Sequence, residues 1–306
     1  MQYIFIINGR DDKSSIRPEI EKQLAGMDFH YEIYMTAGIG DATRYVNLIC
    51  DLYPKIEHCF IACGGFGNGE HGSCAEGVAG VNADGVDVFD EADGDHVAFG
   101  ITNDFVKCFP GRDFNSIRAL LKGTMTKIDA LKVNESYAIN VINIGMDAMV
   151  AYFGEIYHAA GYKDGFKRAL ARAVLGHRIN RVRVEADGRV LSRKYIMQAT
   201  LGNGKICGGE YLCAPRAILD DGLMEVCVFK TMPLLTLLRI LPKYRNGQHL
   251  DDAFSMRHLR YMRAKHVELS SDGLIYLSLD GETIISNHFN IDVLDKAVNL
   301  ILPAEL

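Results

Sequence analysis

The sequence predicts an α/β protein of two domains, a parallel α/β domain over residues 1–126 and a mostly antiparallel β-sandwich over residues 127–306. Two observations predict this division. In the first part, short apolar runs alternate with segments whose apolar residues recur at helical spacing, which is typical of a parallel sheet covered on both faces. In the second part, apolar and polar residues alternate beside Asp-Gly pairs, which is typical of antiparallel hairpins. The last residues are candidates to return to the first domain.

In the first domain, strands and helices are expected to follow one another in the order of a Rossmann-like sheet. Compact apolar runs predict strands at Tyr3–Ile7, His30–Met35 and Cys59–Cys63. Helical periodicity and caps predict helices over 16–24, over 41–53 and from Asp113 to Leu121, the last of them capped by Asp113.

In the second domain, Asp187-Gly188 and Asp280-Gly281 predict tight hairpin turns, because both residue types accept the backbone conformation that such turns need. Helices are expected at Ala148–Ala160, Gly165–Leu175 and Leu234–Tyr244. The segment Leu234–Leu241 is apolar almost all round, so we expect it to pack in the core.

Composition excludes several classes of protein. A net charge of −6 argues against a general nucleic-acid binder. The eight cysteines contain no Cys-x-x-Cys pair, so neither a zinc ribbon nor a disulfide framework is indicated. Apolar runs are too short for a signal peptide or a membrane span. We therefore expect a cytoplasmic protein.

A glycine-rich segment, Cys63 to Gly69, directly follows the third predicted strand. Glycines allow backbone N–H groups to approach a phosphate, so the segment is a candidate phosphate-binding loop. A strained turn without a ligand is the alternative. Residues 67–72 also match the dinucleotide pattern G-x-G-x-x-G, which would suit an NAD-dependent dehydrogenase, but that pattern normally follows the first strand of its fold.

Seven short motifs, in order over most of the chain, carry a resemblance to a known family. Gly64–Asn68 resembles G-G-D-G-T, Ala98–Phe105 resembles P-x-G-T-x-N-D-F, and Asn140–Ala148 resembles N-V-x-x-x-G-F-D-A. Further matches are Gly202-Asn203-Gly204, Ala214-Pro215, Asp220–Leu223 and Leu279–Glu282. The chain thus resembles bacterial diacylglycerol kinases and sphingosine kinase-like lipid kinases, which share an NAD kinase-like fold.

The resemblance implies ATP-dependent phosphorylation of a lipid hydroxyl, with ATP and Mg²⁺ as cofactors and a diacylglycerol-like membrane lipid as substrate. It also implies a set of nucleotide contacts: Asn8, Thr36, Gly64, Gly65, Gly67, Asn68, Gly100, Thr102, Asn103 and Asp104.

Two carboxylates at the second Asp-Gly turn are the candidate catalytic residues. Transfer of phosphate to a hydroxyl needs a base within hydrogen-bonding reach of its proton. The resemblance implies that Glu282 is this base and that Asp280 orients the lipid hydroxyl or a metal. An exposed turn that merely favours Asp-Gly is the alternative.

The segment Asp220–Leu223 can wrap a hard cation with oxygen ligands. By resemblance, the ligands of a structural Mg²⁺ or Ca²⁺ would be the Asp221 carboxylate and the carbonyls of Ile218 and Leu223. A turn without a metal is the alternative.

Residues 163–183 hold seven basic residues and a single acid, Asp164. Phe166, Leu170 and Val174 recur at helical spacing, so the segment predicts a basic amphipathic helix suited to peripheral contact with anionic lipid. A solvated helix is the alternative. The oligomeric state is open, with a homodimer as one candidate.

The sequence departs from the family pattern in its glycine loop. Phe66 replaces the aspartate of the first motif, and Ile101 replaces the threonine of the second. These residues favour one alternative, a non-catalytic relative that binds nucleotide or lipid. A second alternative is a kinase of a soluble substrate such as NAD, since such enzymes share the glycine-aspartate-glycine motif.

Overall fold

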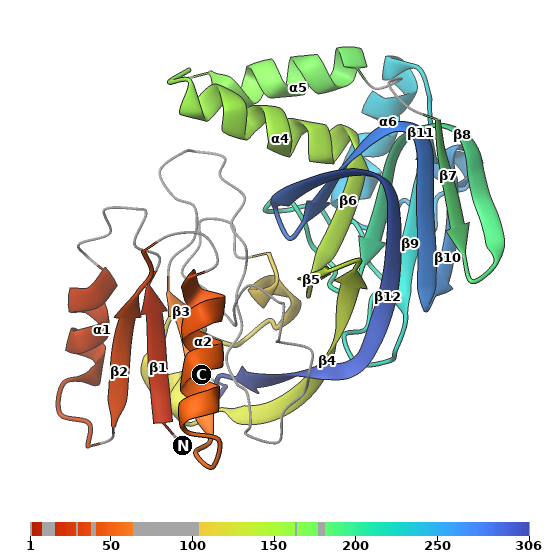
Figure 1. Ribbon diagram of the computed structural model, residues 1–306. Helices are drawn as coiled ribbons and strands as arrows, with labels where there is room; N and C mark the ends of the chain where they lie inside the picture. The colour runs from red at the N-terminus through yellow and green to blue at the C-terminus, as the bar shows by residue number, and fades with distance from the viewer. Residues whose placement is uncertain are drawn as a thin grey trace. The chain divides into compact units, whose positions relative to one another are not determined.

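The computed structural model describes residues 2–7, 16–28, 30–37, 41–63, 104–162, 164–176 and 181–305 (Figure 1). The described residues form two compact units. The first unit contains the described residues up to Ile128 and those from Lys296 onward, and the second contains Asp129–Asp295.

The first unit is built on a parallel three-stranded sheet in the order β2-β1-β3. Its strands are β1 (Gln2–Ile7), β2 (Tyr31–Met35) and β3 (His58–Cys63), and its helices are α1 (Ile16–Leu24), α2 (Asp41–Leu52) and α3 (Ile117–Leu121). A short 3-10 helix, η2, covers Val106–Cys108. The predicted parallel α/β part is therefore confirmed.

Alternate residues of β1 point to opposite faces of this sheet, and each face is covered by helices. Phe5 and Ile7 pack with α1 and α3, through a cluster that includes Ile20 and Leu120. On the other face, Ile4, Ile6 and Phe60 pack against Val46 and Ile49 of α2. Because β1 is apolar on both faces, its sequence is a continuous apolar run, as expected for a buried parallel strand.

One prediction about this unit is wrong. The expected helix from Asp113 begins instead at Ile117, and its cap is Ser116, whose hydroxyl accepts a hydrogen bond from the Ala119 N–H at 3.2 Å. The Asp113 carboxylate accepts a hydrogen bond from the Asn115 N–H at 3.0 Å and so stabilises the preceding turn. Both residue types can cap, so spacing alone does not distinguish them.

The second part of the chain forms one nine-stranded sheet, and the strand pairs whose register is described are antiparallel, as predicted. The strands are β4 (Thr124–Val133), β5 (Ser136–Ala138), β6 (Val141–Gly145), β7 (Arg181–Ala186), β8 (Arg189–Gly202), β9 (Met224–Lys230), β10 (Leu259–Ala264), β11 (His266–Leu279) and β12 (Glu282–Leu302). β6 and β7 each pair with both β8 and β11, at different ends of these long strands.

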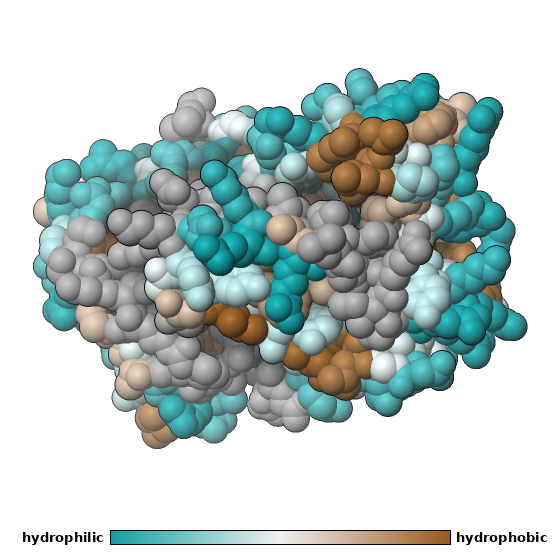
Figure 2. Space-filling view, turned by 90° about the horizontal axis from the view of Figure 1, so that it is seen from above, coloured by the Kyte–Doolittle hydropathy of each residue, from teal (hydrophilic) through white to brown (hydrophobic). Residues whose placement is uncertain are grey.

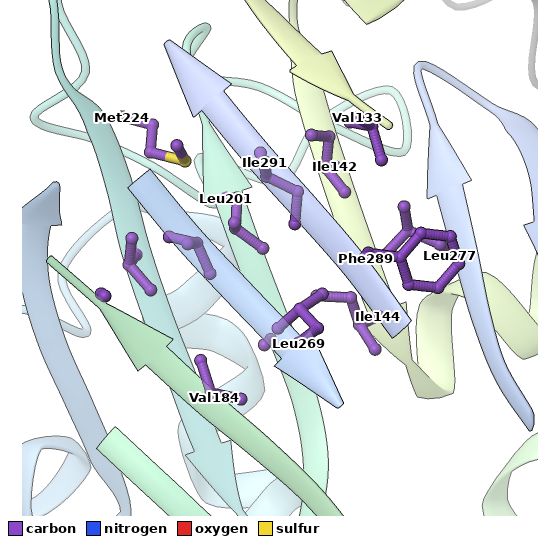
Figure 3. Close-up of a cluster of buried hydrophobic side chains, with 14 of the residues drawn as sticks. Val133, Ile142, Ile144, Val184, Leu201, Met224, Leu269, Leu277, Phe289 and Ile291 are labelled. Atoms are coloured by element: carbon purple, nitrogen blue, oxygen red, sulfur yellow. The ribbon is translucent and has the colours of Figure 1, made fainter. Parts of the chain in front are cut away.

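All nine strands contribute side chains to one apolar core. Figure 3 shows part of this core, with Ile144, Leu201, Leu269 and Phe289 converging from four strands. Both predicted Asp-Gly turns are present: Asp187 and Asp280 have a positive φ of 45° and connect β7 to β8 and β11 to β12.

Four helices accompany this sheet: α4 (Met146–Ala159), α5 (Gly165–Gly176), α6 (Leu234–Arg245) and α7 (Ala253–His258). α4 and α5 form an antiparallel pair in Figure 1. The predicted burial of Leu234–Leu241 is wrong for half of α6. Ile240 is buried in the core, whereas Leu234, Leu235 and Leu238 are 54%, 83% and 54% exposed. Among the described residues, no helix is long and apolar enough to cross a membrane.

Candidate functional site

The three strands of the first unit end at one edge of its sheet, and one predicted nucleotide contact that the structure describes, Thr36, directly follows β2 there. Ile7 lies in register with both Met35 and Cys63, so β1, β2 and β3 end together. In the chain these ends are followed directly by residues 8, 36 and 64. Ligands of parallel α/β folds bind at this carboxyl edge. The Thr36 N–H donates a hydrogen bond to the Ile7 carbonyl at 2.9 Å, which fixes the start of the loop after β2.

Asp104 is the second predicted nucleotide contact that the structure describes. It is buried and forms an ion pair with Lys107, whose Nζ lies 3.0 Å from Asp104 Oδ1. The other predicted contacts lie outside the described residues: Asn8, Gly64, Gly65, Gly67, Asn68, Gly100, Thr102 and Asn103. Their roles stay predictions.

In the second unit, the Asp280 carboxylate holds the segment that leads into β6. Its oxygens accept hydrogen bonds from the N–H groups of Ile139 and Val141, both at 2.7 Å, and of Asn140 at 3.1 Å. Burial raises the pKa of Asp280 to about 6, while these three donors act in the opposite direction. The carboxylate is thus engaged by the backbone, which favours a positioning role for Asp280.

The other Asp-Gly turn provides a structural comparison. The Asp187 carboxylate accepts hydrogen bonds from the N–H groups of Lys265 and His266, at 3.1 Å and 2.9 Å. Both turns therefore use a left-handed aspartate to tie a neighbouring strand in place. What distinguishes the Asp280 turn is its setting, because Glu282 begins β12 two residues later. The side chain of Glu282 lies outside the described part of the structure.

Asn140 and Asn203 extend the contacts of Asp280 into a buried network. The Asn140 carbonyl accepts hydrogen bonds from the N–H groups of Asn203 and Gly204, at 2.9 and 2.8 Å. The Asn203 amide donates to the carbonyls of Asp129 and Ile139, at 2.9 and 2.8 Å. Three motifs that are far apart in the sequence, at 140, 202–204 and 280, thus meet in one hydrogen-bonded cluster.

Asp129 is a member of this cluster that the sequence interpretation missed. It is fully buried, and its carboxylate accepts a hydrogen bond from the Gly222 N–H at 2.7 Å, while its own N–H donates to the Leu219 carbonyl at 2.6 Å. An acid within the apolar run of β4 was the available signal, since buried carboxylates need partners. Asp129 therefore links the cluster to the predicted metal loop.

That loop presents its carboxylate to a cation of the protein itself. Asp221 forms an ion pair with Arg263, and its other oxygen accepts a hydrogen bond from the Leu223 N–H at 3.2 Å. The residue Ile218, whose carbonyl is another predicted ligand, is 48% exposed. Among the described residues, no group of three or more His, Cys, Asp or Glu side chains could hold a metal ion. Metal ligation by Asp221 stays a prediction, and a cation on the oxygen that Arg263 contacts would compete with its guanidinium.

A second polar cluster, also missed from the sequence, lies where β6 runs into α4. Gln198 donates hydrogen bonds to the Asp147 carboxylate at 2.5 Å and to the Tyr244 hydroxyl at 2.9 Å. Thr200 donates to the Asn143 side-chain carbonyl at 2.9 Å. Burial raises the pKa of Asp147 to about 6. A carboxylate with a raised pKa in a polar cluster is a candidate functional group.

The predicted basic helix over 163–183 is present only in part, as α5, because Arg181 and Arg183 lie on β7 instead. Two cations of α5 pack on aromatic rings. The guanidinium of Arg168 lies 4.6 Å from the Tyr162 ring and is paired with Asp164 at 2.8 Å. The guanidinium of Arg172 lies 4.2 Å from the Phe153 ring of α4. The contact between Arg172 and Phe153 joins α5 to α4, and both arginines are exposed.

Comparisons with known proteins match most of the chain. Residues 140–302 match the family model described as the YegS C-terminal NAD kinase beta sandwich-like domain. Proteins named "Probable lipid kinase YegS-like" from Yersinia pestis and Yersinia pseudotuberculosis are 25% identical to this chain, over 98% of its length and 96% of theirs. The crystal structure of a diacylglycerol kinase from Bacillus anthracis matches with a TM-score of 0.61 at 17% identity, over 98% of this chain and 96% of that one. At that identity, the structural match shows the fold alone.

Proposed function

The chain belongs to the family of the YegS C-terminal NAD kinase beta sandwich-like domain, and from this membership we propose that it is an ATP-dependent lipid kinase. Its substrate is proposed to be the hydroxyl of diacylglycerol or a similar membrane lipid. The names of its relatives support the lipid, and the motif match supports the phosphoryl transfer.

The observation that carries the proposal is the anchoring of the Asp280-Gly281-Glu282 turn. Three backbone N–H groups hold Asp280, and the Asn140–Asn203 contacts hold the backbone that supplies them. A base must be fixed relative to the hydroxyl that it deprotonates, because misplacement reduces proton transfer sharply. We assign positioning to Asp280 and the base to Glu282.

In the proposed reaction, the lipid hydroxyl oxygen forms the new bond to the terminal phosphorus, and the bond from that phosphorus to the departing diphosphate breaks. The hydroxyl proton passes to the Glu282 carboxylate. ATP would supply the phosphoryl group, with Mg²⁺ offsetting its charge. Backbone N–H groups of Gly64, Gly65, Gly67 and Asn68 would hold the phosphates, and Thr36 and Asp104 would contribute from the same unit.

The test is ATP-dependent phosphate transfer to diacylglycerol in anionic mixed micelles with Mg²⁺. We expect turnover by the wild-type protein and a loss of about a hundredfold or more in Glu282→Ala, with an unchanged urea unfolding midpoint. Glu135→Ala, which removes an exposed carboxylate from the β4–β5 turn, is the matched control and should keep full activity. Equal turnover in Glu282→Ala would exclude the base assignment.

Phe66 favours a second candidate function, that of a non-catalytic relative. Phenylalanine cannot accept hydrogen bonds from a metal–water network, which the family's aspartate is implied to do. If wild-type protein shows no turnover and Phe66→Asp gains it, the non-catalytic function is the better one. Turnover with NAD in place of diacylglycerol would instead support a kinase of a soluble substrate.

A further inference from the structure

The exposed side of α6 carries an apolar surface that the proposed chemistry does not use. We call Leu234, Leu235 and Leu238 the leucine patch; Leu235 is 83% exposed and the other two are each 54% exposed. The opposite side of the same helix packs in the core through Ile240 and Tyr244. Figure 2 shows that hydrophobic residues on the face in view gather into a few patches among hydrophilic ones. Three neighbouring leucines on one short helix exceed the scattered apolar exposure normal for a surface.

Three cations lie on or beside the strand that leads into this helix. Lys230 ends β9, four residues before α6, and its Nζ donates to the Arg257 carbonyl at 2.8 Å. Arg260 lies opposite Val228 on the neighbouring strand β10, and Lys194 lies two residues before Ile196, the register partner of Lys230, so the three cations are on adjacent strands. Burial, and then the charges of Arg260 and Lys194, lower the pKa of Lys230. The Thr231 hydroxyl donates to the Tyr195 carbonyl at 3.0 Å, which ties the start of α6 to β8 beside Lys194.

Two cations near the carboxyl end of α6 are paired with carboxylates, whereas the three cations on the strands before its start are not. Near its carboxyl end, Lys243 pairs with Asp252 and Arg245 pairs with Glu210. Among the described residues, no salt bridge joins Lys194, Lys230 or Arg260 to a carboxylate. Residues 226–250 contain no Asp or Glu. The chain that leads into the leucine patch therefore lies beside three cations that form no salt bridge among the described residues.

We propose that the leucine patch and these three cations form a docking surface for an anionic phospholipid bilayer. Leucines that enter the acyl boundary and cations that contact phosphate headgroups are the two attractions that hold proteins at such a surface. A second copy of the chain fits less well, because a two-fold dimer through this patch would bring two sets of like charges together. The surface extends the proposed function, since a kinase of a membrane lipid must reach the bilayer, but it also differs from the predicted contact through α5.

The experiment is co-sedimentation of the full chain, without nucleotide, with vesicles of phosphatidylcholine alone or mixed with phosphatidylglycerol. We expect binding to the anionic vesicles only. Leu235→Ser/Leu238→Ser should weaken it about tenfold or more, because two large apolar side chains no longer enter the bilayer. Lys194→Gln/Arg260→Gln should weaken it about fivefold per charge and reduce its salt dependence.

Leu274→Ser is the matched control, because Leu274 is 57% exposed on β11 and lies outside the patch. Unchanged binding in the double leucine variant, or an equal loss in Leu274→Ser, would overturn the proposal. So would a loss confined to Lys167→Gln/Arg172→Gln, which would place the contact on α5. A change from dimer to monomer in the leucine variant with unchanged vesicle binding would assign the patch to a second copy. Binding without kinase turnover would support the surface while contradicting only the proposed reaction.

Discussion

Asp280 and Val141 are joined by two hydrogen bonds that run in opposite directions. The Asp280 N–H donates to the Val141 carbonyl at 3.1 Å, and the Val141 N–H donates to the Asp280 carboxylate at 2.7 Å. Asp280 directly follows the last residue of β11 and holds the first residue of β6, and these two strands are neighbours in the sheet. A residue that fixes both strands at the turn before Glu282 can affect catalysis without touching a substrate.

We expect Asp280→Asn to reduce kcat by at least about tenfold with little change in KM, because the proposed base, Glu282, is displaced while binding is retained. An amide also turns one acceptor into a donor that faces a backbone N–H, so the free energy of unfolding should fall by about 2–3 kcal/mol. Urea unfolding and initial-rate kinetics measure the two effects.

Asp187→Asn is the control for this variant. Its Asp-Gly turn has the same φ and makes comparable bonds to Lys265 and His266, but in an exposed setting. The expected loss is about 1 kcal/mol with unchanged kcat. If both variants lowered kcat equally, global loosening of the sheet would explain the effect, and Asp280 would have no special positioning role.

Gly145→Ala should destabilise the protein by about 2–4 kcal/mol. Gly145 has a φ of +94°, and a Cβ at this position would lie 2.5 Å from the Met197 carbonyl oxygen. The close approach explains why glycine stands between β6 and α4, where β8 packs against it. Thermal or urea unfolding tests the expectation.

The matched control is Gly154→Ala, in the interior of α4. A Cβ added there meets no other atom within 4 Å. Alanine has the higher helix propensity, so this variant should gain about 0.5–1 kcal/mol. Equal effects in both variants would mean that the contact with Met197 does not constrain residue 145.

The elements that the sequence predicts correctly are those with a local cause. β1 and α2 follow from apolar periodicity, and both hairpins follow from the tolerance of Asp-Gly for positive φ. The position of Thr36 at the carboxyl edge of the parallel sheet comes from the structure, and the resemblance alone made it a candidate. Only the family resemblance singles out Asp280, Asn140 and Asn203 as functional candidates.

What could not be predicted depends on partners far along the chain. The acid in β4 suggests a buried partner, but only the fold brings Gly222 and Leu219 to Asp129. The apolar content of α6 predicts burial, yet the sheet covers one side only, so Leu235 is left exposed. Likewise, nothing local indicates that Arg263 pairs with Asp221.

The ion pair between Arg263 and Asp221 leads to a prediction about how metal ions affect stability. With its guanidinium on Asp221, we expect millimolar Mg²⁺ or Ca²⁺ to leave the Tm of the wild-type protein nearly unchanged. Arg263→Gln should lower the free energy of unfolding by about 1–2 kcal/mol and make Tm rise with either cation, since the freed carboxylate can then act as a ligand. Adding Asp221→Asn should abolish that rise. A wild-type Tm that falls on chelation would show instead that a metal displaces Arg263.

The raised pKa of Asp147 leads to a prediction about how stability depends on pH. Its folded-state pKa is about 6 against an ordinary value of 3.8, so between these values the folded state holds a proton that the unfolded chain has released. Stability therefore falls as pH rises from about 4 to about 6, and the penalty persists above 6. Asp147→Asn removes this penalty and can still accept the hydrogen bond from Gln198. It should gain about 2–3 kcal/mol at pH 7.5 and nothing near pH 4.

The comparison with wild type isolates this effect from other groups that titrate in the same range. Burial lowers the pKa of His249 to about 4, which makes both proteins lose stability as pH falls below its ordinary value of 6.5. That contribution is common to both and cancels in the difference. Asp272→Asn, at an exposed position of β11, should show no pH-dependent gain. The contrary result is a difference in the free energy of unfolding between Asp147→Asn and wild type that stays the same from pH 4 to 7.5. That result would mean that Asp147 is ionised in the folded protein throughout, because Gln198 and solvent then offset its burial.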